Sequence, residues 1–300
     1  MDMTHNKCCR HGANLRRRRR RRRKILRSII FSCSIIAVAV FVAVGSSMIR
    51  SGDGRTNRYD VEAGNNTYDN AVIENSKISE KNKIQNNQSM LDDIMNSTQY
   101  PKQLKDLALK NEEALEFVYD YPAEHVKEHT IDLTEEASMD SVPLFVQWDK
   151  RWGYEKYSGN FFAASGCGPT TLSMVVVYLT HDREASPIAV AKYSKEAGYS
   201  VDGSGSSWTL ISEGCRHYGV KAKAVALDES RMKAELDEGH PIVVNVGPGD
   251  FTDTGHFMVI TGYDDEGFSI NDPNSIEKSG KRWLFKNISS QIRAVWSMYV

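Results

Sequence analysis

Residues 165–171, SGCGPTT, decide the fold, because they place a cysteine between two glycines directly before an apolar run. Pro169 and the residues after it, TTLSMVVVYL, are typical of the first turn and the body of a helix. We therefore expect Cys167 to lie at a helix N-terminus. There the helix dipole and the unpaired backbone N–H groups favour the thiolate, and the flanking glycines leave room for a substrate backbone. The pattern predicts a nucleophilic cysteine.

A thiolate nucleophile works best beside an imidazole, which forms an ion pair with it and later donates a proton to the leaving amine. His256 is the strongest candidate among the eight histidines, because it begins the strand-like run HFMVITGY directly after Gly255. The others precede the predicted domain, end predicted helices or precede a proline: His5, His11, His125, His129, His181, His217 and His240. We therefore predict that His256 is the general base.

An imidazole base needs a carboxylate or an amide that orients its ring. Asp272 stands in the sequence NDPN, at the end of the next strand-like run after that of His256. A hairpin that turns between Gly262 and Gly267 would bring Asp272 across to His256. By itself NDPN is ordinary turn chemistry, so the role of Asp272 depends on the order of the three elements.

Those three segments, SGCGPTT, GHFMVITGYD and INDPNS, resemble in their order the C39-like peptidase family of papain-like cysteine hydrolases. The resemblance spans residues 141–300 and includes the segment VPLFVQWDKRWGY and the loop sequences GSGSSW and GPGDF. It implies a papain-like fold in which Cys167 is the nucleophile, His256 the general base and Asp272 the orienting residue. It also implies hydrolysis without a cofactor.

The oxyanion hole is where the chain departs from the family pattern. Papain-like enzymes usually carry a glutamine shortly before the cysteine, but Phe161 stands there. The resemblance instead points to Gln147, in VQWDKRWG, as the side chain that completes the oxyanion hole with the backbone N–H of Cys167. A surface position at the end of a strand is the alternative for Gln147.

The predicted domain, residues 141–300, carries helical patterns first and strand patterns second. Apolar periodicity predicts helices over 169–180, 187–197, 207–217 and 228–238, and strands over 220–227, 241–246, 256–263 and 267–273. The expected fold class is α+β, with the nucleophile at a helix N-terminus and His256 and Asp272 on an antiparallel sheet.

The N-terminal part of the chain predicts a membrane anchor. Residues 1–27 include an unbroken run of eight arginines, and residues 28–49 are apolar and uncharged. At 1.5 Å per residue, about 20 helical residues cross a hydrocarbon core of roughly 30 Å. Cationic flanks stay in the cytoplasm, so residues 1–27 should form a cytoplasmic tail and place the domain outside the cell. A cleaved signal peptide, which would release the domain, is the alternative.

An arginine run can also bind nucleic acid, but such a patch has no reason to precede an apolar helix, so we predict no nucleic-acid partner. Residues 50–100 are polar and lack a sustained apolar period, which predicts a disordered stalk. Residues 101–140 form a predicted helical connector, because an approximate apolar stripe runs between Pro101 and Pro122. We expect it to pack on the domain, and binding to a partner is the alternative.

The predicted topology divides the five cysteines by compartment. Cys8 and Cys9 would lie inside the cell, Cys33 in the bilayer, and Cys167 and Cys215 outside. A disulfide between the outer two is the structural alternative to a nucleophile. A metal site that combines them with the predicted base and acid lacks a close ligand pair such as CxxC or HExxH, so we predict no metal.

Two classes of function fit these residues. The first is an enzyme that cleaves a peptide or amide substrate through an acyl-thioester on Cys167. The second is a cell-surface module that holds a peptide or a cell-wall component in the same cleft without turnover. The chain shows no nucleotide loop of the form GxxxxGK[ST], which disfavours coupled peptide export. Core packing explains most of the aromatic residues, and a substrate groove lined by Trp208 is the alternative.

Overall fold

In the computed structural model of the chain, residues 65–300 are described, and every contact discussed below lies in the unit Ile73–Val300. The predicted tail, membrane anchor and first part of the stalk lie outside the described residues. Among the helices of the described part, none combines the length and the apolar character that a membrane crossing requires.

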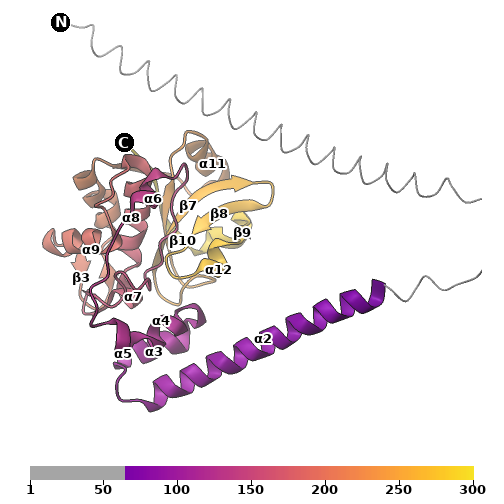
Figure 1. Ribbon diagram of the computed structural model, residues 1–300. Coiled ribbons are helices and arrows are strands. Elements are labelled where there is room, and N and C mark those ends of the chain that lie inside the picture. Colours follow the sequence, from indigo (N-terminus) through magenta and orange to yellow (C-terminus); the bar gives the residue numbers. More distant parts are fainter. Residues whose placement is uncertain (1–64) are drawn as a thin grey trace, which may run out of the picture. The chain divides into compact units, whose positions relative to one another are not determined.

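An antiparallel sheet forms the centre of the domain (Figure 1). Within the described residues it has six strands in the order β5-β10-β6-β7-β8-β9. Their bounds are β5 (Lys221–Ala224), β6 (Ile242–Val246), β7 (His256–Asp264), β8 (Gly267–Asn271), β9 (Arg282–Trp283) and β10 (Ile292–Tyr299). The predicted strands correspond to β5 through β8, and the α+β class is confirmed. The sequence did not lead us to predict β10, which lies between β5 and β6.

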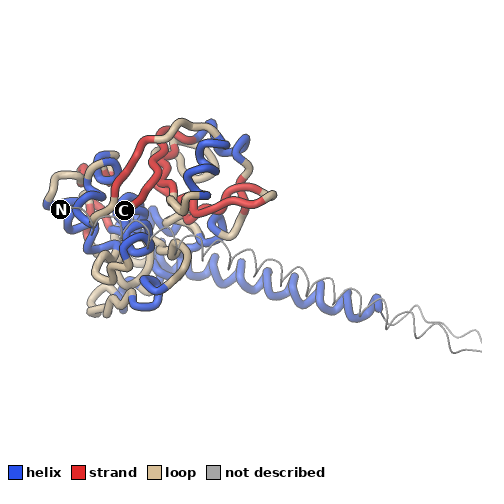
Figure 2. Tube along the Cα trace, turned by 90° about the horizontal axis from the view of Figure 1, so that it is seen from above, coloured by secondary structure: helices blue, strands red, loops and turns tan. Residues whose placement is uncertain are grey.

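Both faces of the sheet are buried, because alternate residues of each central strand enter two different cores. On β7, Phe257 and Val259 pack into one core, and Met258 and Ile260 pack into the other. The first core lies under the helices α8 (Cys167–Thr180), α9 (Pro187–Glu196) and α10 (Thr209–Ser212) and the short helix η2 (Gly214–Tyr218). The second lies under α11 (Glu229–Asp237) and α13 (Phe285–Ile288). Helices therefore flank the strands on both sides (Figures 1 and 2).

The hairpin of β7 and β8 sets the position of the predicted acid. Its last cross-strand pair is Asp264 with Gly267, so the turn is short, as predicted. Gly267 has φ of +135°, and a Cβ there would lie 2.6 Å from the carbonyl oxygen of Trp283. Only glycine fits this position without strain. The tight turn returns the chain along β7, and Asp272 follows directly after β8.

The expected disordered stalk over residues 50–100 differs from the structure, where α2 (Asn65–Asn96) is a helix. Most of its described side chains are exposed, which explains why the sequence shows no clear apolar period. At its end, Met90, Leu91 and Ile94 pack on the helices that follow. Tertiary packing of the last turns thus holds the end of a helix whose own pattern is weak.

The predicted connector helix after Pro101 is interrupted. The segment forms α3 (Lys102–Lys110), η1 (Glu112–Ala114), α4 (Leu115–Tyr119) and α5 (Tyr121–Glu124), and α6 (Thr134–Ser138) follows. The interruption falls at Asn111, whose backbone is extended and whose side chain accepts a hydrogen bond from the N–H of Glu113. The expected packing on the domain is present, since Leu104, Phe117 and Phe161 share one core.

Candidate active site

Cys167 and His256 lie beside each other because α8 packs against β7. Cys167 is the first residue of α8, and His256 is the first residue of β7. The hydroxyl of Thr171, in the first turn of that helix, donates a hydrogen bond of 3.1 Å to the carbonyl of Phe257. The thiol and the imidazole interact electrostatically, and each shifts the pKa of the other. The structure thus brings the first two predicted residues together.

Asp272 holds the other side of the imidazole. The ring nitrogen Nε2 of His256 lies 2.7 Å from Oδ1 of Asp272, whose side chain is completely buried. A carboxylate accepts this bond only if Nε2 carries the proton, which leaves Nδ1 for Cys167. The amide of Asn245 donates to the carbonyl of His256 at 3.2 Å and fixes the backbone there. All three residues of the predicted Cys, His and Asp set are therefore neighbours.

Electrostatics in this buried group favour an ion pair. Burial raises the pKa of the Cys167 thiol, but the hydrogen bond and the charge of His256 outweigh it and bring that pKa below its ordinary value. The backbone N–H groups of Phe257 and Gly168 act in the same direction. Burial lowers the pKa of His256, yet the carboxylate of Asp272 and the thiolate raise it above its ordinary value. These directions match a thiolate–imidazolium pair.

The loop after Asp272 fixes its carboxylate. The backbone N–H of Asn274 donates to Oδ1 of Asp272 at 2.8 Å, so this oxygen accepts bonds from both Asn274 and His256. The backbone N–H of Asp272 donates to the hydroxyl of Ser279 at 2.9 Å. Among the described residues, Oδ2 of Asp272 has no hydrogen-bond partner. The orientation of the carboxylate therefore depends on Oδ1 and on the loop.

Gln147 lies between the nucleophile segment and the acid loop. Its side-chain Nε2 donates to the carbonyl of Ala163 at 2.7 Å, and its backbone N–H donates to the carbonyl of Pro273 at 2.7 Å. The side chain is buried, so the alternative of a surface position is wrong. Ala163 belongs to α7 (Phe162–Ser165), which leads directly into Cys167. The Oε1 atom of the Gln147 amide has no hydrogen-bond partner among the described residues.

The two glycines around Cys167 have a different role from the one expected. A Cβ on Gly168 would lie 2.5 Å from the hydroxyl oxygen of Ser206, and a Cβ on Gly166 would lie 2.6 Å from the ring of Phe162. Both glycines let the cysteine turn pack closely on the protein's own side chains. The expectation that they leave room for a substrate backbone is therefore not supported at these positions.

The two described cysteines are both free, so the alternative of a disulfide between them does not hold. Cys215 is completely buried, and burial raises the pKa of its thiol to about 11. It packs in the core beside Tyr218 and is unsuited to nucleophilic attack. Within the described part of the chain, no three His, Cys, Asp or Glu side chains are placed to hold a metal ion.

Trp208 differs from the other aromatic residues near the site. Trp152 and Tyr157 are buried in the core, as expected for packing. Trp208 is 47% exposed and contacts Trp296 edge to face, with ring centroids 6.0 Å apart. It follows Ser206, the residue that packs on Gly168 beside the nucleophile. Trp208 thus remains available to line a substrate groove.

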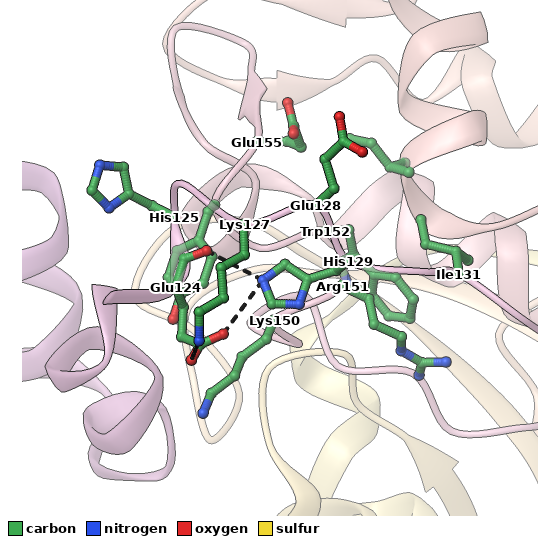
Figure 3. A pocket seen from close by; sticks show the side chains of 12 residues that line it. Glu124, His125, Lys127, Glu128, His129, Ile131, Lys150, Arg151, Trp152 and Glu155 are labelled. Carbon is green, nitrogen blue, oxygen red and sulfur yellow. Dashed lines mark hydrogen bonds and ion pairs between the residues drawn. The ribbon is translucent and has the colours of Figure 1, made fainter. Parts of the chain in front are cut away.

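A cavity of about 360 Å³ lies elsewhere, between residues 124–131, residues 150–155 and Ile188 (Figure 3). The nucleophile, the base and the acid do not line it. Figure 3 shows Lys127 and His129 directed toward Glu124, at 2.7 and 3.6 Å from its carboxylate oxygens. The charges of Lys127 and Glu124 are paired with each other, so these two side chains have little freedom to bind a charged ligand in the cavity.

Sequence reasoning missed several polar residues that support the site, two of them before the domain and one within it. Asn111 and Glu113 contact the loop that follows Asp272, and Ser279 bonds to Asp272 itself. In the sequence they resemble ordinary polar surface residues of a helix or turn. The interruption of the apolar stripe near Asn111 is a weak signal, because it marks only the end of a helix.

Two solved structures show a distant likeness to part of this chain. The peptidase domain of Streptococcus ComA, a bi-functional ABC transporter involved in a quorum sensing pathway, shares 18% identity with a TM-score of 0.38, over 53% of this chain and 96% of that chain. A protein described as a C39-like peptidase from Bacillus anthracis shares 16% identity with a TM-score of 0.34, over 53% and 95%.

No curated protein matches the chain. The family model described as the Peptidase_C39 like family matches residues 139–300. The matched residues make up more than half of the 300 residues and include Cys167, His256 and Asp272. The chain therefore belongs to the Peptidase_C39 like family.

Proposed function

We propose that residues 139–300 form a cysteine peptidase or amide hydrolase in which Cys167 is the nucleophile. The observation that carries this proposal is the placement of three residues together: Cys167 interacts electrostatically with His256, and Nε2 of His256 lies 2.7 Å from Oδ1 of Asp272. A thiolate–imidazolium pair at a helix N-terminus is the arrangement that acyl transfer to sulfur requires. A packed structural cysteine, such as Cys215, has no such partners.

In the proposed reaction, the thiolate of Cys167 attacks the scissile carbonyl carbon, and a C–S bond forms. The negative charge moves to the carbonyl oxygen, where the backbone N–H of Cys167 and an N–H of the Gln147 amide donate to it. One such donor is typically worth about 3 to 4 kcal/mol in the transition state. As the C–N bond breaks, the imidazolium of His256 gives its proton to the leaving amine.

The acyl-thioester is then hydrolysed. His256, now neutral, takes a proton from a water molecule while the water oxygen attacks the thioester carbon. The C–S bond breaks, the acid product leaves, and the thiolate–imidazolium pair is restored. Asp272 keeps the proton on Nε2 of His256 through both halves, so that Nδ1 always faces the sulfur.

Alkylation of the full-length protein with iodoacetamide tests the nucleophile without a known substrate. We expect the peptide that contains Cys167 to be modified at pH 6 at least about tenfold faster than an ordinary thiol, whose pKa is near 8.5. The His256→Ala variant should lose this advantage, and Cys215 should stay unmodified in both proteins. Mass spectrometry of the labelled peptides measures the rates. An ordinary rate for Cys167 in the unsubstituted protein would contradict the proposal.

We also propose that residues 28–49 anchor the protein in the cell membrane, with the domain outside. The arginine run and the apolar segment support this proposal. The full-length protein is expected to sediment with membranes after a carbonate wash, and protease added to intact cells should digest the domain. A matched variant with a polar sequence at 28–49 should be soluble. Release of a shortened chain into the medium would instead indicate a cleaved signal peptide.

A further inference from the structure

The segment before the family domain reaches the candidate active site. We call residues 90–124 the brace; they comprise the last turns of α2 and the helices α3, η1, α4 and α5. The family model begins at residue 139, so membership in the family does not account for the brace. Two of its polar side chains, Asn111 and Glu113, bond to the loop that carries Asp272.

Asn111 is linked to the catalytic carboxylate through one residue. Its side-chain Nδ2 donates to the backbone oxygen of Asn274 at 2.9 Å and to the side-chain Oδ1 of the same residue at 3.1 Å. The backbone N–H of Asn274 donates to Oδ1 of Asp272 at 2.8 Å. That oxygen is the one that bonds to His256. A short series of hydrogen bonds therefore connects Asn111 with the imidazole.

Glu113 binds the part of the same loop that follows Asn274. Its carboxylate accepts bonds from the hydroxyl of Ser275 and from the backbone N–H groups of Ile276, at 2.7 Å, and Glu277, at 3.1 Å. These groups form the start of the short helix α12 (Ile276–Ser279), where unpaired N–H groups favour an acidic partner. The last residue of α12 accepts the bond from the backbone N–H of Asp272.

The apolar side chains of the brace pack on the segment that holds Gln147, the proposed oxyanion-hole residue. Leu104, Phe117 and Val118 are buried in one core with Phe161 and Ala163. The carbonyl of Ala163 accepts the bond from the side chain of Gln147, as described above.

Trp148 connects the core of the brace with the loop of Asp272. The indole of Trp148 packs on the core of the brace, and its Nε1 donates to the carbonyl of Asn274 at 3.2 Å. The brace therefore contacts the segment of Gln147 and the loop of Asp272 together.

We propose that the brace is a positioning element of the active site, in which Asn111 and Glu113 hold the Asp272 loop so that its carboxylate stays directed at His256. This inference rests on the proposed function for its effect on turnover, but its effect on the thiol does not depend on any substrate. Oδ2 of Asp272 has no partner among the described residues, so few contacts besides those of the loop fix the carboxylate. Residues that orient a reacting group indirectly are typically worth about tenfold or more in activity.

The test compares Asn111→Ala and Glu113→Gln with the matched control Glu112→Gln in the full-length protein. The Glu112 side chain is exposed and bonds to Asn87 at 2.7 Å, away from the Asp272 loop. The pH dependence of Cys167 alkylation by iodoacetamide is measured by mass spectrometry, together with the melting temperature. A looser carboxylate stabilises the imidazolium less, so the midpoint of alkylation should move to higher pH in both test variants and stay unchanged in the control.

With a cleaved peptide in hand, kcat should fall about tenfold in the test variants with little change in KM, because the substrate groove is not touched. A lower melting temperature with an unchanged alkylation midpoint in both folded test variants would overturn the proposal, since the brace would then stabilise the fold only. If Asn111→Ala does not fold, the alkylation midpoints of Asn111→Ser and Glu113→Gln test the proposal instead.

If the proposed peptidase function is wrong, the experiments give a different result from a failure of the positioning role. The unsubstituted protein would then show a low alkylation midpoint that depends on Asn111 and Glu113, but no peptide turnover. Shifted midpoints without turnover would therefore keep the positioning role and reject the peptidase. Normal turnover with unshifted midpoints would keep the peptidase and reject the positioning role.

Discussion

Replacement of Cys167 by alanine is expected to abolish peptide turnover while the fold stays intact. In a hydrolase with a comparable group of three residues, loss of the nucleophile costs on the order of 10⁶-fold in kcat, which corresponds to about 8 kcal/mol. The change removes only the sulfur from a partly exposed position at the start of α8, so packing should change little. Cleavage of a peptide library, followed by mass spectrometry, measures the loss.

Cys215→Ala is the matched control for this experiment. Cys215 is buried in the core and has a raised pKa, so its replacement should lower stability somewhat but leave turnover close to that of the unsubstituted protein. Circular dichroism should show the same secondary structure for all three proteins. Turnover that survives in Cys167→Ala would assign the chemistry to another residue.

Replacement of Asp272 by asparagine is expected to shift the alkaline limit of activity to lower pH. The carboxylate raises the pKa of His256, so the imidazolium and its thiolate partner coexist from the lowered pKa of Cys167 up to the raised pKa of His256. Asparagine can still accept the bond from Nε2 but carries no charge. The removal of a nearby opposite charge should lower the pKa of His256 by about 1 to 3 units.

The pH dependence of kcat/KM measures this shift, since it reports the ionisations of the free enzyme. The acid limit belongs to the thiol and should move to higher pH, because a less stable imidazolium stabilises the thiolate less. Asp272→Ala is the companion variant, because it removes the acceptor as well as the charge. It should lose about 10⁴-fold in kcat, as expected when the base is left without its orienting group. An unchanged alkaline limit in Asp272→Asn would show that the carboxylate does not set the pKa of His256.

The core of the candidate site could be predicted from the sequence because its signals are local. The position of Cys167 at the start of a helix follows from Pro169 and the apolar run after it. The hairpin that brings Asp272 to His256 follows from two alternating runs separated by turn residues. The structure places the three side chains together for these reasons.

The parts that could not be predicted depend on contacts between distant segments. The strand β10 shows an apolar pattern, but its place between β5 and β6 is set by pairing with strands far away in the chain. The end of α2 is helical because Ile94 packs on the helices α3 and α4, and the polar composition of α2 does not reveal this contact. The bonds of Asn111 to Asn274 join residues 163 positions apart.

The interrupted connector shows how such a contact changes local structure. The apolar stripe after Pro101 predicts one continuous helix, but Asn111 leaves the helical conformation. Its side chain then reaches both the start of the next turn and the loop after Asp272. Helix propensity differs little among most polar residues, so two side-chain bonds are enough to decide the conformation at such a position.

The place of β10 has a consequence for the order of assembly during synthesis. Both cores include residues of this strand, and β5 joins the main sheet through β10 alone within the described residues. The helix of Cys167 is synthesised more than 100 residues earlier than residues 292–299. While the chain is still being made, the sheet lacks the strand that joins β5 to β6, and long-range pairing of this kind forms late. We therefore expect the proposed peptidase activity to begin only once synthesis has passed β10.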